Sequence, residues 1–313
     1  MSENRCQICD GNEIFFHEVD QVAYYQCDSC SSISVDRNFS NNKQKIYDES
    51  YWENELNSSK SRAFGGNVIR YAELFLLSRI ELKKIIDISS GPGLILDSIS
   101  TILPNSINNF FAIEPFPPPL KYRTKNKNYN VGNIQDLKSK FDGGCCIEVI
   151  EHLNYDQLCD LVKKLAMISN DGACYYFNSG QPSFVQNNLS YLDPFGRGHI
   201  ASYSLKALEM IFSKYEFRLF ELPSRDYGFV VEYKSKNKQY DLIHRIGNPN
   251  KKNIENIYKN EYGQLFYEMG LVSLLHTHSE SLIKPNNHNH NESRYHLFIR
   301  LLKKIIYKLR NKI

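Results

Sequence analysis

The chain has 313 residues, 42% of them apolar, and a formal net charge of only +3. This length suits one large α/β domain with smaller additions, and the small net charge argues against a nucleic acid as the main partner. The start, MSENRCQICD, lacks the pattern of an export signal. No apolar run reaches the ~18 residues of a membrane span. Eight cysteines in a chain without an export signal indicate a reducing compartment. We therefore expect a cytoplasmic protein.

Residues 1–40 contain two C-x2-C pairs separated by two strand-like runs, Glu13–Val19 and Val22–Gln26. Each pair offers two thiolates, and two such pairs closing on one ion form a tetrahedral zinc site. A complete four-thiolate shell leaves no open position, so we expect a structural zinc. Iron in a rubredoxin-like site and four ordinary cysteines are the alternatives. The predicted ligands are Cys6, Cys9, Cys27 and Cys30.

Residues 41–83 are expected to link this module to the rest of the chain. A polar connector, 41–60, holds the only tryptophan, Trp52. Apolar residues at helical spacing then predict a helix over 62–80.

Between residues 84 and 235, short apolar runs alternate with helical patterns. Helices are predicted over 94–103, 155–169 and near 204–214. Apolar strands separated by helices indicate a parallel sheet covered on both faces, and the last two strands are expected to pair antiparallel at its edge. The predicted strands are Ile85–Ile88, Phe110–Glu114, Cys145–Ile150, Ala173–Asn178, Phe217–Leu222 and Gly228–Tyr233.

The strand ending at Asp87 is followed by a turn containing Gly91 and Gly93 and then by a helix. Glycines let a backbone approach a nucleotide-like ligand, which the helix N-terminus then faces. Glu114, at the end of the next strand, offers a carboxylate for both hydroxyls of a ribose. A tight turn with no ligand is the alternative interpretation.

Several motifs in this region resemble those of class I S-adenosylmethionine-dependent methyltransferases. They are Asp87-Ile88-Ser89-Ser90-Gly91-Pro92-Gly93, Phe111-Ala112-Ile113-Glu114-Pro115, Asn130-Val131-Gly132-Asn133-Ile134 and Glu148-Val149-Ile150-Glu151-His152-Leu153. The resemblance implies a Rossmann-like core that binds the methyl donor. It places Asp87, Ser89, Gly91 and Gly93 near the methionine part, Glu114 on the ribose, Asn133 and Ile134 near the adenine, and Glu148 beside the methyl group.

Two positions depart from the family pattern. Ser89 replaces a glycine, and it fits the turn if its φ angle stays negative. Asn170-Asp171-Gly172 stands where the family has Lys-Pro-Gly-Gly, which is a turn.

Glu148, Glu151 and His152 have helical i, i+3, i+4 spacing, so their side chains project together if a helix starts there. With His199 from the next loop, they resemble the ligands of metal-assisted O-methyltransferases, which implies Mg or Mn. Two other interpretations stay open: a capping and packing role, and His152 or His199 as a catalytic general base without metal. The long loop Gln181–Gly198 is expected to cover the acceptor.

Residues 236–313 are expected to form a helical extension. A helix is predicted over roughly 254–282. The Asn/His-rich stretch around His288 and His290 reads as a surface loop, and the basic terminal helix Tyr295–Ile313 as a solvated end with a weak possible membrane-surface contact.

Together these features predict a Rossmann-like class I methyltransferase core (84–235) with an N-terminal zinc ribbon (1–40) and a C-terminal helical extension (236–313). The ribbon followed by this core resembles a bacterial group associated with sugar and surface-polysaccharide genes. We therefore expect O- or C-methylation of a small molecule, a sugar or nucleotide-sugar. The alternatives are metal-assisted 2′-O-methylation of RNA 3′ ends and a non-catalytic adaptor on a methyltransferase scaffold. The oligomeric state is not predicted.

Overall fold

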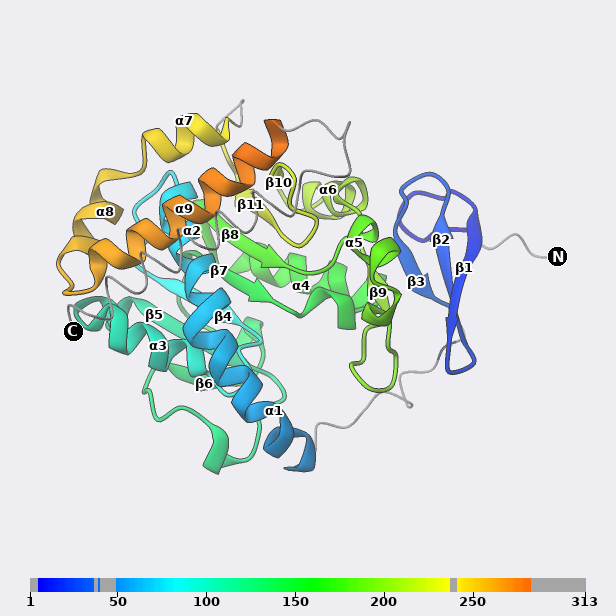
Figure 1. Cartoon of the computed structure of the whole chain (residues 1–313), viewed down its shortest axis with the longest axis horizontal. Helices are drawn as coiled ribbons and strands as arrows, with labels where there is room; N and C mark the ends of the chain where they lie inside the picture. The colour runs from blue at the N-terminus through cyan, green and yellow to red at the C-terminus, as the bar shows by residue number, and fades with distance from the viewer. Residues whose placement is uncertain (1–4, 37–38, 40–48, 237–240, 283–313) are drawn as a thin grey trace, which may run out of the picture.

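The computed structural model describes residues 5–36, 39, 49–236 and 241–282 (Figure 1). Its larger sheet has seven strands in the order β10-β11-β8-β7-β4-β5-β6. The inner strands run parallel, whereas β10 pairs antiparallel with β11 and β11 with β8. The strands are β4 (Ile85–Ile88), β5 (Phe110–Glu114), β6 (Tyr129–Val131), β7 (Phe141–Ile147), β8 (Ser169–Asn178), β10 (Phe217–Glu221) and β11 (Phe229–Tyr233). The predicted parallel sheet with an antiparallel edge is confirmed.

Helices cover both faces of this sheet, because its residues alternate between two apolar clusters. Ile85 and Cys145 face one cluster, while Ile86 and Cys146 face the other. The first cluster lies under α2 (Val68–Leu77), α3 (Leu94–Ile102), α7 (Leu242–Gly247), α8 (Lys251–Tyr258) and α9 (Gly263–Leu282), and the second under α4 (Tyr155–Met167) and α6 (Leu205–Ser213). The predicted core burial holds for Cys145, Cys146 and Cys174, while Cys159 is only half-buried.

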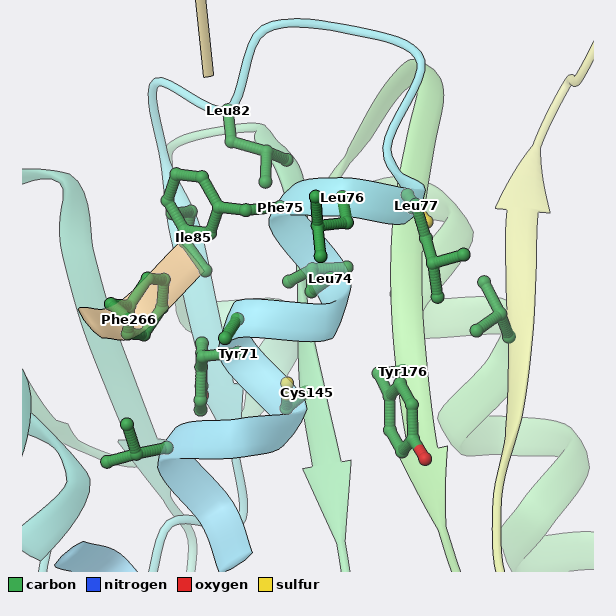
Figure 2. Packing of buried hydrophobic residues seen from close by; sticks show 14 of the residues in the cluster. Tyr71, Leu74, Phe75, Leu76, Leu77, Leu82, Ile85, Cys145, Tyr176 and Phe266 are labelled. Atoms are coloured by element: carbon green, nitrogen blue, oxygen red, sulfur yellow. The ribbon is translucent and has the colours of Figure 1, made fainter. Parts of the chain in front are cut away.

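The extension is part of the core, since α9 crosses α2 and packs against it (Figure 1). Figure 2 shows Phe75 of α2 and Phe266 of α9 in the same apolar cluster, with their rings 5.8 Å apart and edge to face. Gly270 permits the close approach of these helices, because a Cβ atom there would lie 2.7 Å from the carbonyl carbon of Ala72. Residues 254–282 form two helices rather than the one predicted, with a break near Asn260.

The connector prediction for 41–60 is wrong over its second half, because α1 (Glu49–Arg62) begins at Glu49. It continues through a π-helical turn, Ala63–Asn67, directly into α2. The helix was not predicted because its sequence is mostly polar. Its residue Trp52 is nevertheless buried.

The turn expected at Asn170–Gly172 lies inside β8, which begins at Ser169. A register shift against β7 between Phe141 and Gly143 accommodates these residues. A short polar stretch resembles a turn in the sequence, but a strand with a register shift or β-bulge can contain it.

The N-terminal module forms a second, four-stranded sheet in the order β1-β2-β3-β9. The strands β1 (Glu13–Val19) and β2 (Val22–Cys27) match the two predicted runs. β3 (Ile33–Val35) and β9 (Ala201–Ser202) were not predicted. Because β9 belongs to the segment after β8, the module and the core share this sheet, as seen to the right in Figure 1.

The loop Gln181–Gly198 is more ordered than its sequence suggests. It contains α5 (Pro182–Asn187) and a short 3₁₀ turn, Leu189–Tyr191.

No helix in the described part of the chain has the length and apolar character of a membrane span. The predicted surface loop around His288 and His290 and the predicted terminal helix Tyr295–Ile313 both lie outside the described residues.

Candidate functional site

Polar residues gather where the parallel strands end. Asp87 lies at the end of β4, Glu114 ends β5 and Asn178 ends β8, while Glu148 directly follows β7. Carboxyl ends of neighbouring parallel strands share one sheet edge, which is where open α/β sheets bind ligands. This edge therefore brings together the residues predicted from sequence.

Asp87 is buried and accepts a hydrogen bond from the hydroxyl of Tyr71 at 2.8 Å. Burial raises the pKa of Asp87 to about 7. The condition under which a serine was expected to fit, a negative φ, is not met, because the φ of Ser89 is +54°. The turn needs a left-handed residue here whatever the side chain. Ser90 follows, and its buried hydroxyl has no hydrogen-bond partner among the described residues.

Glu114 is tied to the glycine turn. Its carboxylate accepts the backbone N–H of Gly91 at 2.6 Å and that of Phe116 at 2.8 Å. Burial raises the pKa of Glu114 even though both hydrogen bonds favour its charged form. The strand-end acid and the turn thus form one rigid unit.

The glycine at position 93 is required by packing as well as by its φ of +75°. A Cβ atom there would lie 2.5 Å from Cγ2 of Thr124 and 2.6 Å from the ring of Tyr129. The hydroxyl of Tyr129 donates to the carbonyl of Gly91 at 2.7 Å. Trp52 also lies against the turn, 3.7 Å from where a Gly91 Cβ would stand. The sequence analysis assigned no role at the site to Trp52 or Tyr129.

Asn133 and Ile134 lie just past β6, next to β5. The backbone N–H of Gly132 bonds the carbonyl of Glu114 at 3.0 Å, which holds this segment at the same edge. Asn133 caps the 3₁₀ turn Ile134–Asp136. The side chain of Ile134 is buried in the apolar cluster under α4.

The acid–histidine segment is not an α-helix. Glu148 has a φ of +56°, and Ile150–His152 forms a 3₁₀ turn. The helix on which the predicted joint projection depended is therefore absent, although Glu148 still lies near Glu151, whose charge adds to burial in raising the pKa of Glu148. Glu148 instead accepts hydrogen bonds from Asn178 and from the hydroxyl of Tyr227, each at 2.8 Å.

The other three members of the predicted cluster do come together. Ligand atoms of Glu151, His152 and His199 lie within 4.8 Å of one another. Glu151 is fully buried, and neither of its carboxylate oxygens has a hydrogen-bond partner within the described part of the chain. Nε2 of His199 lies 4.0 Å from Oε1 of Glu151. A buried carboxylate without hydrogen-bond partners is costly, so these two oxygens are available to a ligand that enters the cluster.

Both imidazoles are oriented by backbone carbonyls. Nδ1 of His152 lies 3.1 Å from the carbonyl of Gly198, and Nδ1 of His199 lies 2.8 Å from that of Tyr191. Each carbonyl accepts, so each Nδ1 carries the hydrogen and each Nε2 keeps a lone pair. The two rings are 4.9 Å apart.

Burial governs the titration of this cluster. It lowers the pKa of His199 to about 3, with His152 adding to the effect, and it also lowers the pKa of His152. It raises the pKa of Glu151 to about 7 and, together with the neighbouring Glu151, that of Glu148 to about 8. Both imidazoles are neutral near pH 7 as a result.

The four cysteines of the N-terminal module converge as predicted, with their Sγ atoms all within 4.8 Å of one another. Cys6 and Cys30 are 3.8 Å apart between sulfurs, and Cys9 and Cys27 are 3.4 Å apart. Zn–S bonds of about 2.3 Å in a tetrahedron separate sulfurs by roughly 3.8 Å, so the donor set fits zinc. The backbone N–H of Cys30 also points to the sulfur of Cys27 at 3.4 Å, which suits a thiolate.

A family model described as a methyltransferase domain matches residues 61–222, just over half of the chain. The chain belongs to this methyltransferase domain family. The match begins in α1 and ends just after β10, so it includes the glycine turn, Glu114 and the acid–histidine cluster. The cysteine module and α7–α9 lie outside it.

Several solved structures are similar in fold. CalS10, an amino pentose methyltransferase from Micromonospora echinaspora, is 11% identical over 60% of this chain and 98% of its own, with a TM-score of 0.43. DesVI from Streptomyces venezuelae is 13% identical over 60% and 99%, with a TM-score of 0.45. RosA from Streptomyces davawensis, a dimethyltransferase of 8-amino-8-demethyl-D-riboflavin, is 15% identical over 60% and 61%, with a TM-score of 0.45. The match to RosA thus spans about three fifths of that protein's length. A comparison with curated proteins found none that matches this chain.

Proposed function

We propose that the chain transfers a methyl group from S-adenosylmethionine to an oxygen or carbon of a small-molecule acceptor. The observation that carries this proposal is the unit formed by Asp87, the turn Ser89–Gly93 and Glu114 at the carboxyl edge of a methyltransferase-domain sheet. The unpartnered hydroxyl of Ser90 offers a further polar contact to a ligand in this turn.

In this proposal Asp87, Ser89, Gly91 and Gly93 lie near the methionine part of the cofactor, and Glu114 binds the ribose. Asn133 and the backbone of Ile134 lie near the adenine, and Glu148 lies beside the methyl group. The cofactor supplies a sulfonium methyl group, whose C–S bond breaks as the bond to the acceptor forms. Positioning by the protein supplies much of the rate of such a transfer.

The acceptor would enter beside Glu148 and the two histidines. Asn178 and Tyr227, both bonded to Glu148, add polar groups at the same strand ends. Such a polar surface suits an acceptor rich in hydroxyls, and we propose a sugar or nucleotide-sugar. The acceptor's proton would pass to Nε2 of His152 or His199, whose lone pairs the backbone carbonyls preserve. Of the two, His199 is the weaker base, because burial lowers its pKa to about 3.

Calorimetric titration with S-adenosylhomocysteine tests the cofactor site. We expect saturable binding by the wild-type chain and at least about tenfold weaker binding by Glu114→Gln, because a charged hydrogen-bond acceptor is lost. Glu13→Gln, on the cysteine module, serves as the matched control and should bind normally. Absence of binding by the wild-type chain would refute the proposal. Mass-spectrometric screening of sugar-nucleotides with S-adenosylmethionine would then identify the acceptor, and turnover would also exclude the adaptor alternative.

A divalent metal at Glu151, His152 and His199 is a second candidate, favoured by the two unpartnered oxygens of Glu151. Ligand bonds near 2.1 Å require donor atoms roughly 3 to 3.5 Å apart, so the three side chains, whose donor atoms lie within 4.8 Å of one another, need to move closer together to bind an ion. Two imidazoles and one carboxylate suit a borderline ion such as Mn²⁺ better than Mg²⁺. Glu148 is committed to Asn178 and Tyr227, so the four-ligand set predicted from sequence reduces to three.

Such an ion would hold an acceptor hydroxyl and favour its alkoxide, which points to O-methylation. Excess EDTA separates the two mechanisms. Full activity in EDTA leaves His152 or His199 as a metal-free base, whereas loss of activity restored by Mn²⁺ supports the metal. Manganese electron paramagnetic resonance on the protein without acceptor gives a reading independent of turnover.

A further inference from the structure

The cysteine module contacts the segment that carries His199 through a continuous set of backbone pairs. We call this contact, between Ile33–Val35 and residues 200–202, the seam. β3 pairs with β9 through Ile33 with Ser202 and Ser34 with Ala201. The backbone N–H of Val35 extends this ladder to the carbonyl of Ile200 at 2.9 Å. The module thus binds the main chain directly after His199.

Tyr24 carries the seam to His199 itself. Its hydroxyl donates to the carbonyl of His199 at 2.7 Å, and its side chain is fully buried. Tyr24 belongs to β2, which ends at the metal-site residue Cys27. The four-cysteine site and the histidine are therefore joined by one short strand and one buried hydrogen bond.

Apolar packing supports the same contact. Val22, Tyr24 and Ile33 of the module form one buried cluster with residues of the loop after β8. That cluster includes Tyr191, whose carbonyl orients Nδ1 of His199 and whose ring lies 4.5 Å from the imidazole. Both the backbone and the ring of His199 are thus held by groups that pack on the module.

The far side of the seam is fixed as well. Ser204 caps α6, and its hydroxyl donates to the carbonyl of Cys30. Lys206 reaches the carbonyl of Ser29 at 2.7 Å. The backbone on the C-terminal side of His199 is consequently attached to the second cysteine pair.

The cofactor unit is supported by other elements. Tyr71 of α2 holds Asp87, Tyr129 holds Gly91 and Trp52 of α1 covers the turn. A change in the seam should therefore reach His199 without reaching the cofactor unit.

We propose that the cysteine module helps to position the acceptor side of the site, and that Tyr24 is the positioning residue for His199. The inference rests on the proposed function for its catalytic meaning. It assigns to the module a role beyond stability: the module sets where the His199 imidazole stands relative to His152 and Glu151.

The variant Tyr24→Phe removes the hydroxyl and keeps the ring, so the apolar cluster stays filled. Tyr25→Phe is the matched control, because Tyr25 lies on the opposite face of β2 and packs its ring edge to face on Phe15, 6.2 Å away. In spectra of protein labelled at the histidine Cε1 carbons, we expect Tyr24→Phe to shift the His199 signal and Tyr25→Phe to leave it in place. His199→Gln assigns the signal, and the exposed His244 gives an internal reference.

For an acceptor found by the screen above, we expect kcat/KM to fall about threefold to tenfold in Tyr24→Phe, the effect of one buried hydrogen bond. The dissociation constant of S-adenosylhomocysteine should stay within about twofold of the wild-type value. The lost hydrogen bond orients His199 on the acceptor side, whereas other groups hold the cofactor unit. Tyr25→Phe should match the wild type in both measurements.

An unshifted His199 signal in Tyr24→Phe overturns the proposal, whatever the activity. A loss of S-adenosylhomocysteine affinity equal to the loss of kcat/KM also overturns it, because the effect would then be general. If the wild-type chain binds no S-adenosylhomocysteine, the proposed function fails, while the His199 signal still decides whether Tyr24 fixes the imidazole.

Discussion

Ser89 occupies a backbone conformation that a glycine adopts without cost. Its φ of +54° places a Cβ atom where L-residues meet the following carbonyl oxygen. Glu148 shows the same feature, with a φ of +56°, directly after the next strand inward. Left-handed residues therefore end two neighbouring strands at the candidate site, where stored backbone strain commonly gathers.

Substitutions at Ser89 should rank by their tolerance of positive φ. We expect Ser89→Val to lower the free energy of unfolding by about 1–2 kcal/mol, because a β-branched residue is strongly disfavoured there. Ser89→Gly should change it by less than about 1 kcal/mol, since relief of strain and the greater freedom of the unfolded chain oppose each other. Urea denaturation measures both, and equal stability of the two variants would contradict the assigned backbone geometry.

At the level of helices and strands, α9 depends on its close approach to α2. A Cβ atom at Gly270 would lie 2.7 Å from the Ala72 carbonyl carbon, and this backbone cannot rotate away. We expect Gly270→Ala to destabilise the chain by about 1–3 kcal/mol through overpacking. Gly247→Ala is the control, because nothing lies within 4 Å of its added Cβ. Guanidinium unfolding of both variants gives the comparison, and a neutral Gly270→Ala would mean that the helices stand further apart.

The helix α7 is attached to the sheet by a buried ion pair between Arg245 and Glu232 of β11. Arg245 also donates to the carbonyl of Leu77 at 2.9 Å. We expect Arg245→Met to cost about 3–5 kcal/mol, because Glu232 is left as an uncompensated buried charge. The double variant Arg245→Met with Glu232→Gln should recover most of that loss. A double variant no more stable than the single one would show that the pair is not the cause.

Most of the core was predictable from sequence, and the reasons are specific. The runs at Ile85–Ile88 and Phe110–Glu114 are strands at their predicted bounds, because buried parallel strands are apolar throughout. The α1 helix was not predictable, since its polar sequence has no helical apolar stripe. β9 was not predictable either, because its pairing with β3 depends on a distant segment.

The candidate site was predictable to the same degree. Asp87 and Glu114 follow from strand ends and motifs, and Glu151, His152 and His199 do meet as expected. The absence of Glu148 from this three-residue cluster could not be predicted, because the i, i+3, i+4 spacing was interpreted as a helix. Its hydrogen-bond partner Tyr227 also lies far along the chain. Contacts made by Trp52 and Tyr129 arise only in the folded chain.

For the whole molecule, the cysteine module is joined to the core by the pairing of β3 with β9. We expect one zinc ion per chain by elemental analysis and none after Cys6 and Cys9 are both changed to serine. Because metal binding by such a module is also folding energy, this variant should lose the order of β1–β3, seen as rapid proteolysis within residues 5–36. Calorimetric binding of S-adenosylhomocysteine should persist. A metal-free variant that resists protease as the wild type does would show that the cysteines are ordinary core residues.

The strand β9 has only two residues, yet it completes a sheet that begins at the other end of the chain. Tyr24 and His199 are separated by 175 residues in sequence. During synthesis the N-terminal module therefore leaves the ribosome long before the edge that receives it exists. Its thiolates can collect a metal early, but the docked arrangement waits until β9 has emerged. The order of translation delays this seam, and with it completion of the acceptor side, until β4–β8 have been made.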